Sequence, residues 1–387
     1  MSRIYLDHAA TTPMIPEAVE AMTRELTRVG NASSLHASGR SARRVVEESR
    51  ESIAAQIGAR PAELIFTSGG TEADNLAIKG AFWSGATASR RRVITSTLEH
   101  HAVLDSVAWL ERSASAEVSY VPVDSAGRTG LSAFTEAVDS RTALVSVMWA
   151  NNEVGVLQPL RQIAGVAAEH GAISHSDAVQ AVGHIEVDFA VSGLDLLSFT
   201  AHKLGGPYGI GALLARREIQ LAPIMHGGGQ ERDIRSGTLD VAATAGFAAA
   251  LEVATKNRVQ EEHRIRQLRT ELVNSVLAVV PDAIPYGPTT EGDRLPGIAN
   301  IGFPGCSADA VLMLLDAAGI DCSTGAACSA GVPQPSHVLI AMGCSEAEAR
   351  SALRFSLGHT STLADVQALA AALPEAVQRA KAAAAFA

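Results

Sequence analysis

The sequence has few cysteines, few aromatic residues and no paired metal-binding motifs. Its 387 residues include 4 cysteines, and no two of them form a Cys-x-x-Cys pair. So few thiols in so long a chain argue against a disulfide framework, and a structural zinc site needs closer ligand pairs. The 12 histidines form no His-Glu-x-x-His motif, so the sequence predicts no metal site. The open question is whether one cysteine is chemically used.

Positive charge is also scarce. The chain has 31 lysines and arginines against 41 aspartates and glutamates, a net charge of −10. This balance gives no general reason to bind nucleic acid or an anionic membrane. No segment approaches a run of apolar residues long enough for a membrane span, and the N-terminus lacks the pattern of a signal peptide. We therefore expect a cytoplasmic protein with no direct contact to membranes or nucleic acid.

The residues that are present predict an α/β fold. Hydrophobic residues make up 47% of the chain, which is typical of a globular protein of two or three structural units. Between residues 63 and 216, short apolar runs rich in β-branched residues alternate with turns and helix-compatible stretches. We expect strands at 64–67, 92–97, 118–123, 143–150, 172–176, 194–200 and 211–215. Their apolar character is typical of a sheet covered on both faces.

A second unit is predicted after a helical stretch at residues 239–280. This stretch is rich in alanine and then in charged residues, and no strand is expected before Gly297. Beyond it, expected strands at 298–303, 321–323 and 353–356 alternate with helices such as 308–318. We interpret the helical stretch as a link to a smaller α+β domain.

Lys203 lies where an expected strand meets the glycines at 205 and 206. A lysine shielded there by apolar neighbours has a lowered pKa and can act as a Schiff-base nucleophile. The alternative is a surface lysine in a turn.

Two further signals agree with the reactive lysine. Gly70 and Thr71 connect an expected strand to an expected helix, and the N–H groups of a helix N-terminus suit a phosphate ester. Asp177 ends another expected strand, where a carboxylate can keep a pyridine nitrogen protonated. The alternatives are a capped tight turn and a helix cap. A phosphate cradle, an acid and a lysine in this order predict pyridoxal 5′-phosphate as the cofactor.

Motifs along nearly the whole chain give a close resemblance to the cysteine desulfurases of the NifS/IscS type, within the class V aminotransferases. They lie at residues 5–13, 31–36, 71–75, 151–155, 198–203, 226–231 and 235–238. The resemblance implies a PLP-dependent transferase fold, aspartate aminotransferase-like and of fold type I. A large domain at 16–258 would hold a mostly parallel seven-stranded sheet. Residues 1–15 and 259–387 would form a small α+β domain with the catalytic cysteine loop.

The resemblance also implies which residues hold the cofactor. Lys203 would bind its aldehyde, Asp177 its pyridine nitrogen and Gln180 its ring hydroxyl. His100 would stack on the ring and carry protons for the thiol groups. The other expected cofactor contacts are Gly70, Thr71, Asn152, Thr200, His202 and Thr238. Thr238 would reach the phosphate of the neighbouring subunit, which implies a homodimer.

For the substrate, L-cysteine, the resemblance implies that Arg354 grips the carboxylate through bidentate hydrogen bonds, with Asn152 and Asn31 assisting. The alternative for Arg354 is a solvated side chain.

The nucleophile implied by the resemblance is Cys328, in a segment of small residues at 323–331. The segment departs from the family pattern at Ala326 and Ser329, where a serine and a threonine are usual. An exposed loop of small residues can carry sulfur from a buried site to an acceptor. The other three cysteines have no matching role and are expected to pack.

The sequence thus predicts a cysteine desulfurase that releases L-alanine and leaves a persulfide on Cys328. The sulfur acceptor would be an iron–sulfur scaffold, a tRNA-thiolation enzyme or an apo-protein. One alternative is a selenocysteine lyase or an aminotransferase, which uses the same cofactor residues without a persulfide. Another is a non-catalytic scaffold that binds partners, which would not require the whole set of Lys203, Asp177, His100, Arg354 and Cys328.

Overall fold

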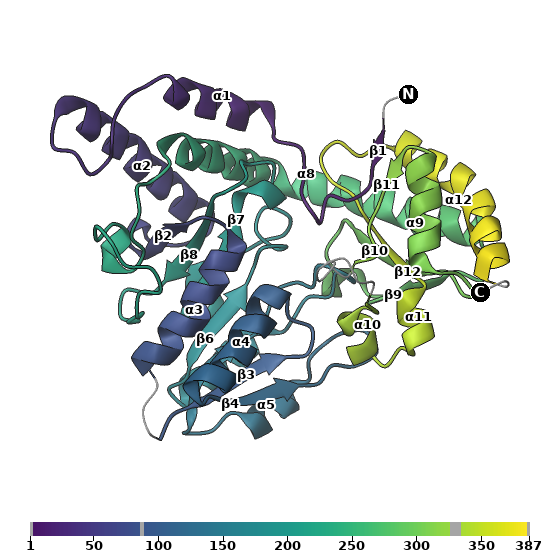
Figure 1. The fold of residues 1–387 in the computed structure, drawn as a ribbon, viewed down its shortest axis with the longest axis horizontal. Helices are drawn as coiled ribbons and strands as arrows, with labels where there is room; N and C mark the ends of the chain where they lie inside the picture. Colours follow the sequence, from purple (N-terminus) through teal and green to yellow (C-terminus); the bar gives the residue numbers. More distant parts are fainter. Residues whose placement is uncertain (1–2, 86–88, 326–333, 385–387) are drawn as a thin grey trace.

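The chain is described by a computed structural model at residues 3–85, 89–325 and 334–384. Figure 1 shows a larger part built on a wide sheet beside a smaller part that contains the C-terminus. The helix α8 (Val241–Val279) passes behind both.

The larger part contains a seven-stranded sheet in the order β2-β8-β7-β6-β5-β3-β4. Its strands are β2 (Leu64–Thr67), β3 (Arg92–Ser96), β4 (Glu117–Val121), β5 (Thr142–Ser146), β6 (Ile173–Asp177), β7 (Leu196–Thr200) and β8 (Gly211–Ala215). β8 runs opposite to the other six strands, so the predicted mostly parallel sheet is confirmed. Because β2 and β7 are both antiparallel to β8, β2 points the same way as the parallel strands. The carboxyl ends of β2, β3, β5, β6 and β7 therefore meet at one edge.

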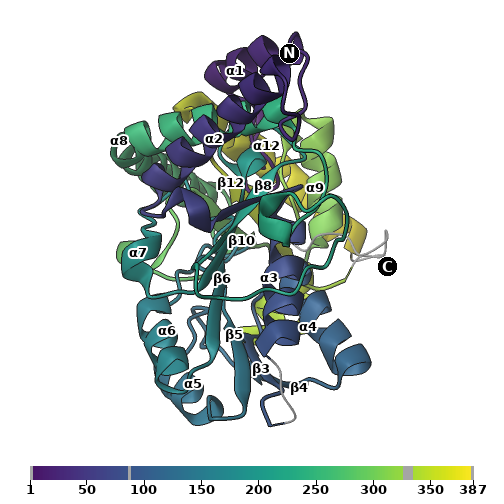
Figure 2. The ribbon, with the colours of Figure 1, turned by 90° about the vertical axis from the view of Figure 1, so that its left-hand side faces the viewer.

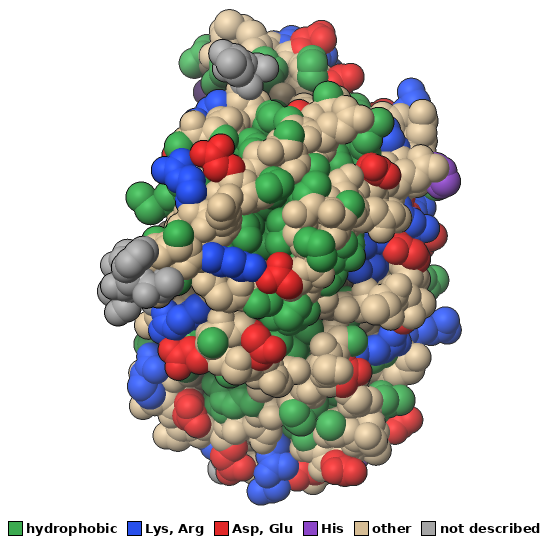
Figure 3. Space-filling model, turned by 90° about the vertical axis from the view of Figure 1, so that its right-hand side faces the viewer, with side chains coloured by type: hydrophobic (Ala, Val, Ile, Leu, Met, Phe, Trp, Pro, Cys, Tyr) green, Lys and Arg blue, Asp and Glu red, His purple; other side chains and the backbone are tan. Residues whose placement is uncertain are grey.

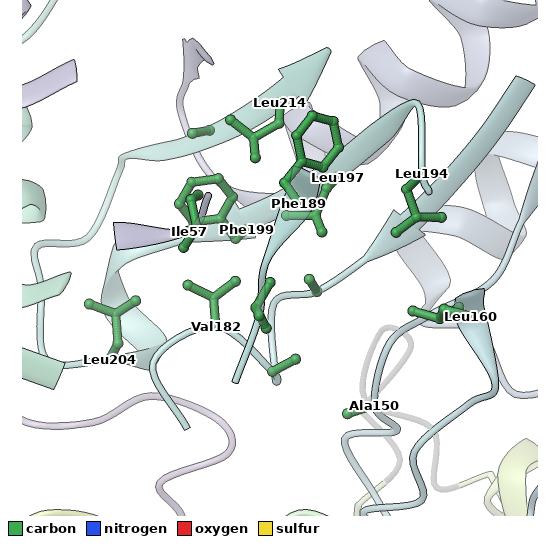
Figure 4. Close-up of a cluster of buried hydrophobic side chains, with 14 of the residues drawn as sticks. Ile57, Ala150, Leu160, Val182, Phe189, Leu194, Leu197, Phe199, Leu204 and Leu214 are labelled. Carbon is green, nitrogen blue, oxygen red and sulfur yellow. The ribbon is translucent and has the colours of Figure 1, made fainter. Parts of the chain in front are cut away.

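Helices cover both faces of this sheet, which explains its apolar strands. They are α3 (Gly70–Gly85), α4 (His101–Ala114), α5 (Leu131–Ala137), α6 (Leu160–Glu169) and α7 (Phe189–Ser192). Figure 2 shows α3 and α4 on one side of the sheet and α5, α6 and α7 on the other. Successive side chains of β7 point to opposite faces of the sheet. Leu196 packs in the core beneath α3, and Leu197 packs in the core on the other face. Figure 4 shows Leu197, Phe199 and Leu214 together in that second core.

The smaller part is built on two small sheets. One is antiparallel in the order β12-β10-β9, and in the other β1 pairs in parallel with β11. The strands are β1 (Ile4–Tyr5), β9 (Ile284–Tyr286), β10 (Ile298–Gly302), β11 (Ile320–Asp321) and β12 (Ala352–Ser356). The helices are α9 (Ala308–Ala317), α10 (His337–Ala341), α11 (Glu346–Arg350) and α12 (Leu363–Ala384). Leu6 from the N-terminal segment packs in the same core as Phe303 and Phe355.

The 39 residues of α8 contribute to both parts. Phe247 and Leu251 pack in the core of the large sheet, whereas Leu272 and Val276 pack in the core of the smaller part. The helices α1 (Pro16–Leu26) and α2 (Ala37–Gln56) lie along its first half. The connecting role of this helical stretch agrees with the sequence, and the domain boundary at residue 258 stays a prediction.

Some predicted elements were wrong in detail. β9 lies where no strand was expected before Gly297, and β1 was not predicted. Both have at most three residues and pair with distant segments, so they leave no periodicity in the sequence. β5 ends at Ser146 and not at Ala150, although Trp149 still donates a backbone hydrogen bond to Asp177. No helix begins directly after Asp177, whose Oδ1 accepts from the Val179 N–H at 2.9 Å within a turn.

Figure 3 shows the face of the smaller part, on which hydrophobic side chains lie between charged side chains of both signs. Within the described ranges, no helix has both the length and the apolar character required to cross a bilayer.

Candidate active site

The carboxyl edge of the large sheet borders a cavity of about 370 Å³. The residues that line it come from the ends of several strands and from β12 of the smaller part. Ten predicted site residues are among them: Gly70, Thr71, His100, Asn152, Asp177, Gln180, Thr200, His202, Lys203 and Arg354. The sequence thus identified most of one continuous surface.

Lys203 is held at the end of β7 by the short 3-10 helix η2 (Ala201–Lys203). Burial lowers the pKa of its amine to about 8, and the positive charge of Arg354 acts in the same direction. Its Nζ donates hydrogen bonds to the carbonyl oxygens of Ala9 at 2.6 Å and Ala10 at 2.7 Å. The amine therefore loses its proton more readily than a surface lysine and can act as a nucleophile or base.

Asp177 is the last residue of β6 and is 6% exposed. Burial raises the pKa of its carboxyl group, while His100 and Lys203 act against this rise. Burial and the charge of Asp177 also raise the pKa of Asp74 well above its usual value. Asp74 Oδ1 has no hydrogen-bond partner among the described residues. A buried carboxylate at a cavity wall, beside a second carboxyl group whose neutral form is favoured, suits a cationic ring nitrogen.

His175 belongs to β6, two residues before Asp177, and its Nε2 lies 3.6 Å from Asp74 Oδ1. Its ring nitrogens lie 2.8 Å from Ser146 Oγ and 2.9 Å from Ser198 Oγ. Burial lowers the pKa of His175 to about 3, so the ring is neutral and does not compensate the charge of Asp177.

His100 lies at the start of α4, after the carboxyl end of β3. Its Nδ1 accepts a hydrogen bond from the Ala102 N–H at 3.1 Å, and burial lowers the pKa of its imidazole. The ring is therefore neutral near physiological pH and its Nδ1 is used by the helix cap.

The wall formed by α3 suits an anion. The helix begins at Gly70, and a Cβ added there would lie 2.7 Å from Val179 Cγ2, so a larger residue would push into the cavity wall. The partial positive charge of the helix N-terminus faces this region, as a phosphate group requires. Thr200 donates to the Ile210 carbonyl oxygen at 2.9 Å, and His202 Nδ1 lies 3.2 Å from Thr11 Oγ1.

Arg354 reaches the cavity from β12 and is 4% exposed. One terminal nitrogen donates to Asp7 Oδ1 at 2.7 Å and the other to the Asn152 carbonyl oxygen at 3.0 Å. Its Nε is buried without a hydrogen-bond partner among the described residues. The predicted alternative of a solvated arginine is therefore wrong.

Two predicted residues lie away from the cavity in the single chain. Asn31 is exposed between α1 and α2, and Thr238 is exposed before α8. Neither lines the cavity wall.

Cys328 lies outside the described residues. Ser323 and Gly325, which precede it, line the cavity. Cys306 and Cys322 are buried, and Cys344 is partly buried. Burial raises the pKa of all three thiols, to about 12 for Cys322, so they are poor nucleophiles.

Sequence reasoning missed two acidic residues of the site. Asp7 binds Arg354, and Asp74 lines the cavity next to Asp177. Both belong to motifs that carry the family resemblance, at 5–13 and 71–75. The position of Asp7 and Asp74 in those motifs could have identified them as site residues.

A second cavity of about 360 Å³ adjoins the first and is lined partly by His8, His184 and His359. Of the predicted site residues, only Gln180 and Lys203 belong to it, within the described chain. The first cavity is therefore the candidate active site, because it holds most of the predicted site residues.

Comparison with known proteins identifies the family and several relatives of the chain. Residues 4–369 match the family model described as Aminotransferase class-V. The chain is 56% identical to an IscS-like cysteine desulfurase of Mycobacterium tuberculosis, over 98% of each chain. A solved NifS-like protein superposes with a TM-score of 0.88 at 32% identity, covering 100% of both chains. The structure of SspA in complex with cysteine superposes with a TM-score of 0.79 at 33% identity, covering 91% of this chain and 98% of SspA.

Proposed function

The chain belongs to the aminotransferase class-V family, and within it to the cysteine desulfurases, and from this premise we propose how it takes sulfur from L-cysteine. The observation that carries the proposal is that one cavity unites the half-buried Lys203, whose amine has a lowered pKa, with the buried Asp177 and the buried Arg354. These are the groups that a pyridoxal phosphate and an amino acid need. L-alanine and a persulfide on Cys328 are the proposed products.

The residues of the cavity fit pyridoxal 5′-phosphate. Lys203 would hold its aldehyde, Asp177 its ring nitrogen and Gln180 its ring hydroxyl. The phosphate would lie at the N-terminus of α3, with Gly70, Thr71, Thr200 and His202 around it and Thr238 of the partner subunit completing the site. When bound, the cofactor supplies a protonated ring that stabilises negative charge at the α-carbon of the amino acid.

Each protein group then has a defined task in the reaction. Arg354 binds the carboxylate of L-cysteine, with Asn152 and Asn31 assisting. Lys203 takes the α-proton at Nζ, which its lowered pKa favours. Asp177 keeps the ring nitrogen protonated, and the neutral His100 carries protons of the thiol groups.

Cys328 is the proposed sulfur acceptor. Its thiolate forms an S–S bond with the substrate sulfur as the C–S bond of L-cysteine breaks. The electron pair of that bond stays on the β-carbon, which is protonated to give L-alanine. Gly325 on the cavity wall is three residues away, a span that an extended chain covers in about 10 Å. The persulfide would then pass to an iron–sulfur scaffold, a thiolation enzyme or an apo-protein.

The assembly and location follow from the same proposal. We infer a homodimer, because Thr238 is exposed and away from its own cavity. The cytoplasm suits a reactive thiol, since thiols stay reduced there. We further propose that residues 16–258 and residues 1–15 with 259–387 act as two domains, with the cavity between them.

The test is to incubate the cofactor-loaded protein with L-cysteine, quantify L-alanine and locate the persulfide by peptide mass spectrometry. Cys328→Ala should abolish alanine formation, whereas the matched control Cys344→Ala should keep it. Full alanine production by Cys328→Ala would contradict the proposed mechanism.

The same experiment separates the alternatives. A selenocysteine lyase would release alanine from selenocysteine without Cys328, and an aminotransferase would form a keto acid. Protein that binds no pyridoxal phosphate would point to a non-catalytic scaffold.

A further inference from the structure

Asp7 is the one acidic side chain that contacts Arg354 among the described residues. The pair joins the N-terminal segment to β12 across 347 positions of sequence. The side chains are 20% and 5% exposed, so the interaction is shielded from solvent. Charged hydrogen bonds of this kind are stronger and more directional than exposed ion pairs.

The backbone around Asp7 is fixed on the strand that carries Arg354. Ser356 donates its N–H to the Leu6 carbonyl oxygen at 2.7 Å, and His8 donates to the Ser356 carbonyl oxygen at 3.2 Å. Leu6 also donates to the Asp321 carbonyl oxygen at 2.9 Å. Asp7 is therefore held from both sides, two residues along β12 from the arginine that it binds.

The contact leaves the arginine able to bind a further anion. A guanidinium group has five N–H donors. Asp7 and the Asn152 carbonyl oxygen each accept one hydrogen bond, and Nε has no partner among the described residues. A carboxylate can thus bind while Asp7 stays in place. Asp7 orients the guanidinium group and leaves other N–H donors available to the carboxylate.

We propose that Asp7 is the positioning residue of Arg354, which it orients for the α-carboxylate of the amino-acid substrate. This inference rests on the proposed function, since it takes an amino acid as the ligand of the cavity. Without Asp7, Arg354 samples other side-chain orientations and binding of the carboxylate weakens. Among the described residues, Asp7 has no contact with His100, which is assigned to the later chemistry at sulfur, so that chemistry should be little affected.

The experiment measures amino-acid binding and turnover separately in the cofactor-loaded dimer. L-alanine is titrated against the absorbance of the bound cofactor to give a Kd, and L-cysteine turnover gives KM and kcat. We expect Asp7→Ala to raise both Kd and KM about 10-fold, as loss of a charged hydrogen bond implies, with kcat changed less than about 2-fold. Asp7→Asn keeps the size of the side chain and should give a smaller rise.

A second set of variants tests whether Asp7 acts through Arg354. In the Arg354→Ala background, Asp7→Ala should leave the Kd of L-alanine unchanged. Asp321→Asn is the matched control, because Asp321 lies on the neighbouring strand β11 and pairs with Arg3 outside the cavity. It should leave Kd and KM at their wild-type values.

Two results would overturn the inference. One is an unchanged or lower Kd in both Asp7 variants, and the other is an equal rise of Kd with and without Arg354. If the wild-type protein binds L-alanine but forms none from L-cysteine, the proposed function fails while the Kd values still decide the role of Asp7.

Discussion

Lys203 and Ala9 are joined by a hydrogen bond of 2.6 Å from Nζ to the backbone carbonyl oxygen, although 194 positions separate them in the sequence. The half-buried amine thus donates hydrogen bonds to carbonyl groups of the N-terminal segment and, among the described residues, to no carboxylate. Carbonyl oxygens satisfy its hydrogen-bonding capacity without fixing its positive charge. The lysine can therefore be buried and still lose its proton.

The first prediction concerns the pH dependence of cofactor binding by the apoprotein. Only the neutral amine of Lys203 can react with an aldehyde, and burial lowers its pKa from 10.5 to about 8. The rate of attachment of pyridoxal phosphate should rise with pH around a midpoint near 8 and level off above it. Stopped-flow absorbance measures this rate. A midpoint near the ordinary value of 10.5 would show that the surroundings of Lys203 do not lower its pKa.

The lowered pKa of Lys203 also predicts that the stability of the apoprotein depends on pH. Because the folded-state pKa lies below the ordinary value, the unfolded state binds more protons between pH 8 and 10.5, and stability rises with pH in this window. Relative to Lys203→Met, the free energy of unfolding of the wild-type apoprotein should gain about 3 kcal/mol across it. Urea denaturation at several pH values measures the difference. A constant difference would contradict the lowered pKa.

Asp177 and Asp74 should respond differently to removal of charge. Asp177→Asn removes the anion that stabilises a protonated ring, and we expect alanine formation to fall by at least about 100-fold. Burial and the charge of Asp177 raise the pKa of Asp74 well above its usual value, which favours its neutral form. Asp74→Asn should therefore retain most activity. Equal losses in the two variants would show that Asp74 is also charged.

The buried pair of Arg50 and Glu231 should be important for stability. Arg50 donates to both carboxylate oxygens of Glu231, at 2.6 and 3.0 Å, and Glu231 also accepts from the Phe66 N–H at 2.7 Å. Arg50→Ala leaves a buried carboxylate without its partner and should cost about 3–5 kcal/mol of unfolding free energy. The exposed pair of Arg379 and Glu375 provides the control, and Arg379→Ala should cost less than about 1 kcal/mol. Similar losses in both variants would contradict this account.

Local patterns in the sequence were sufficient for much of the fold. Several strands of the large sheet are nearly continuous apolar runs, and two of these, β2 and β8, have the predicted bounds. The short strands β1 and β9 were not predictable, because their stability comes from pairing with β11 and β10. Two or three residues carry no periodicity, and partners distant in the chain cannot be inferred from one segment.

The sequence by itself determined which chemical groups are present at the site. The sequence assigned a chemical role to Lys203 after a strand, to Asp177 at a strand end and to Gly70 at a helix start. The parallel sheet brings all three residues to one edge. Only the tertiary structure decided which groups modify them. Three contacts at the site join segments that are far apart in the chain. Lys203 donates hydrogen bonds to carbonyl groups of the N-terminal segment, Asp74 lies near Asp177, and Asp7 pairs with Arg354. Burial and charge are properties of such packed neighbours, so the pKa of an amine and the orientation of a guanidinium follow from the folded chain and not from local sequence.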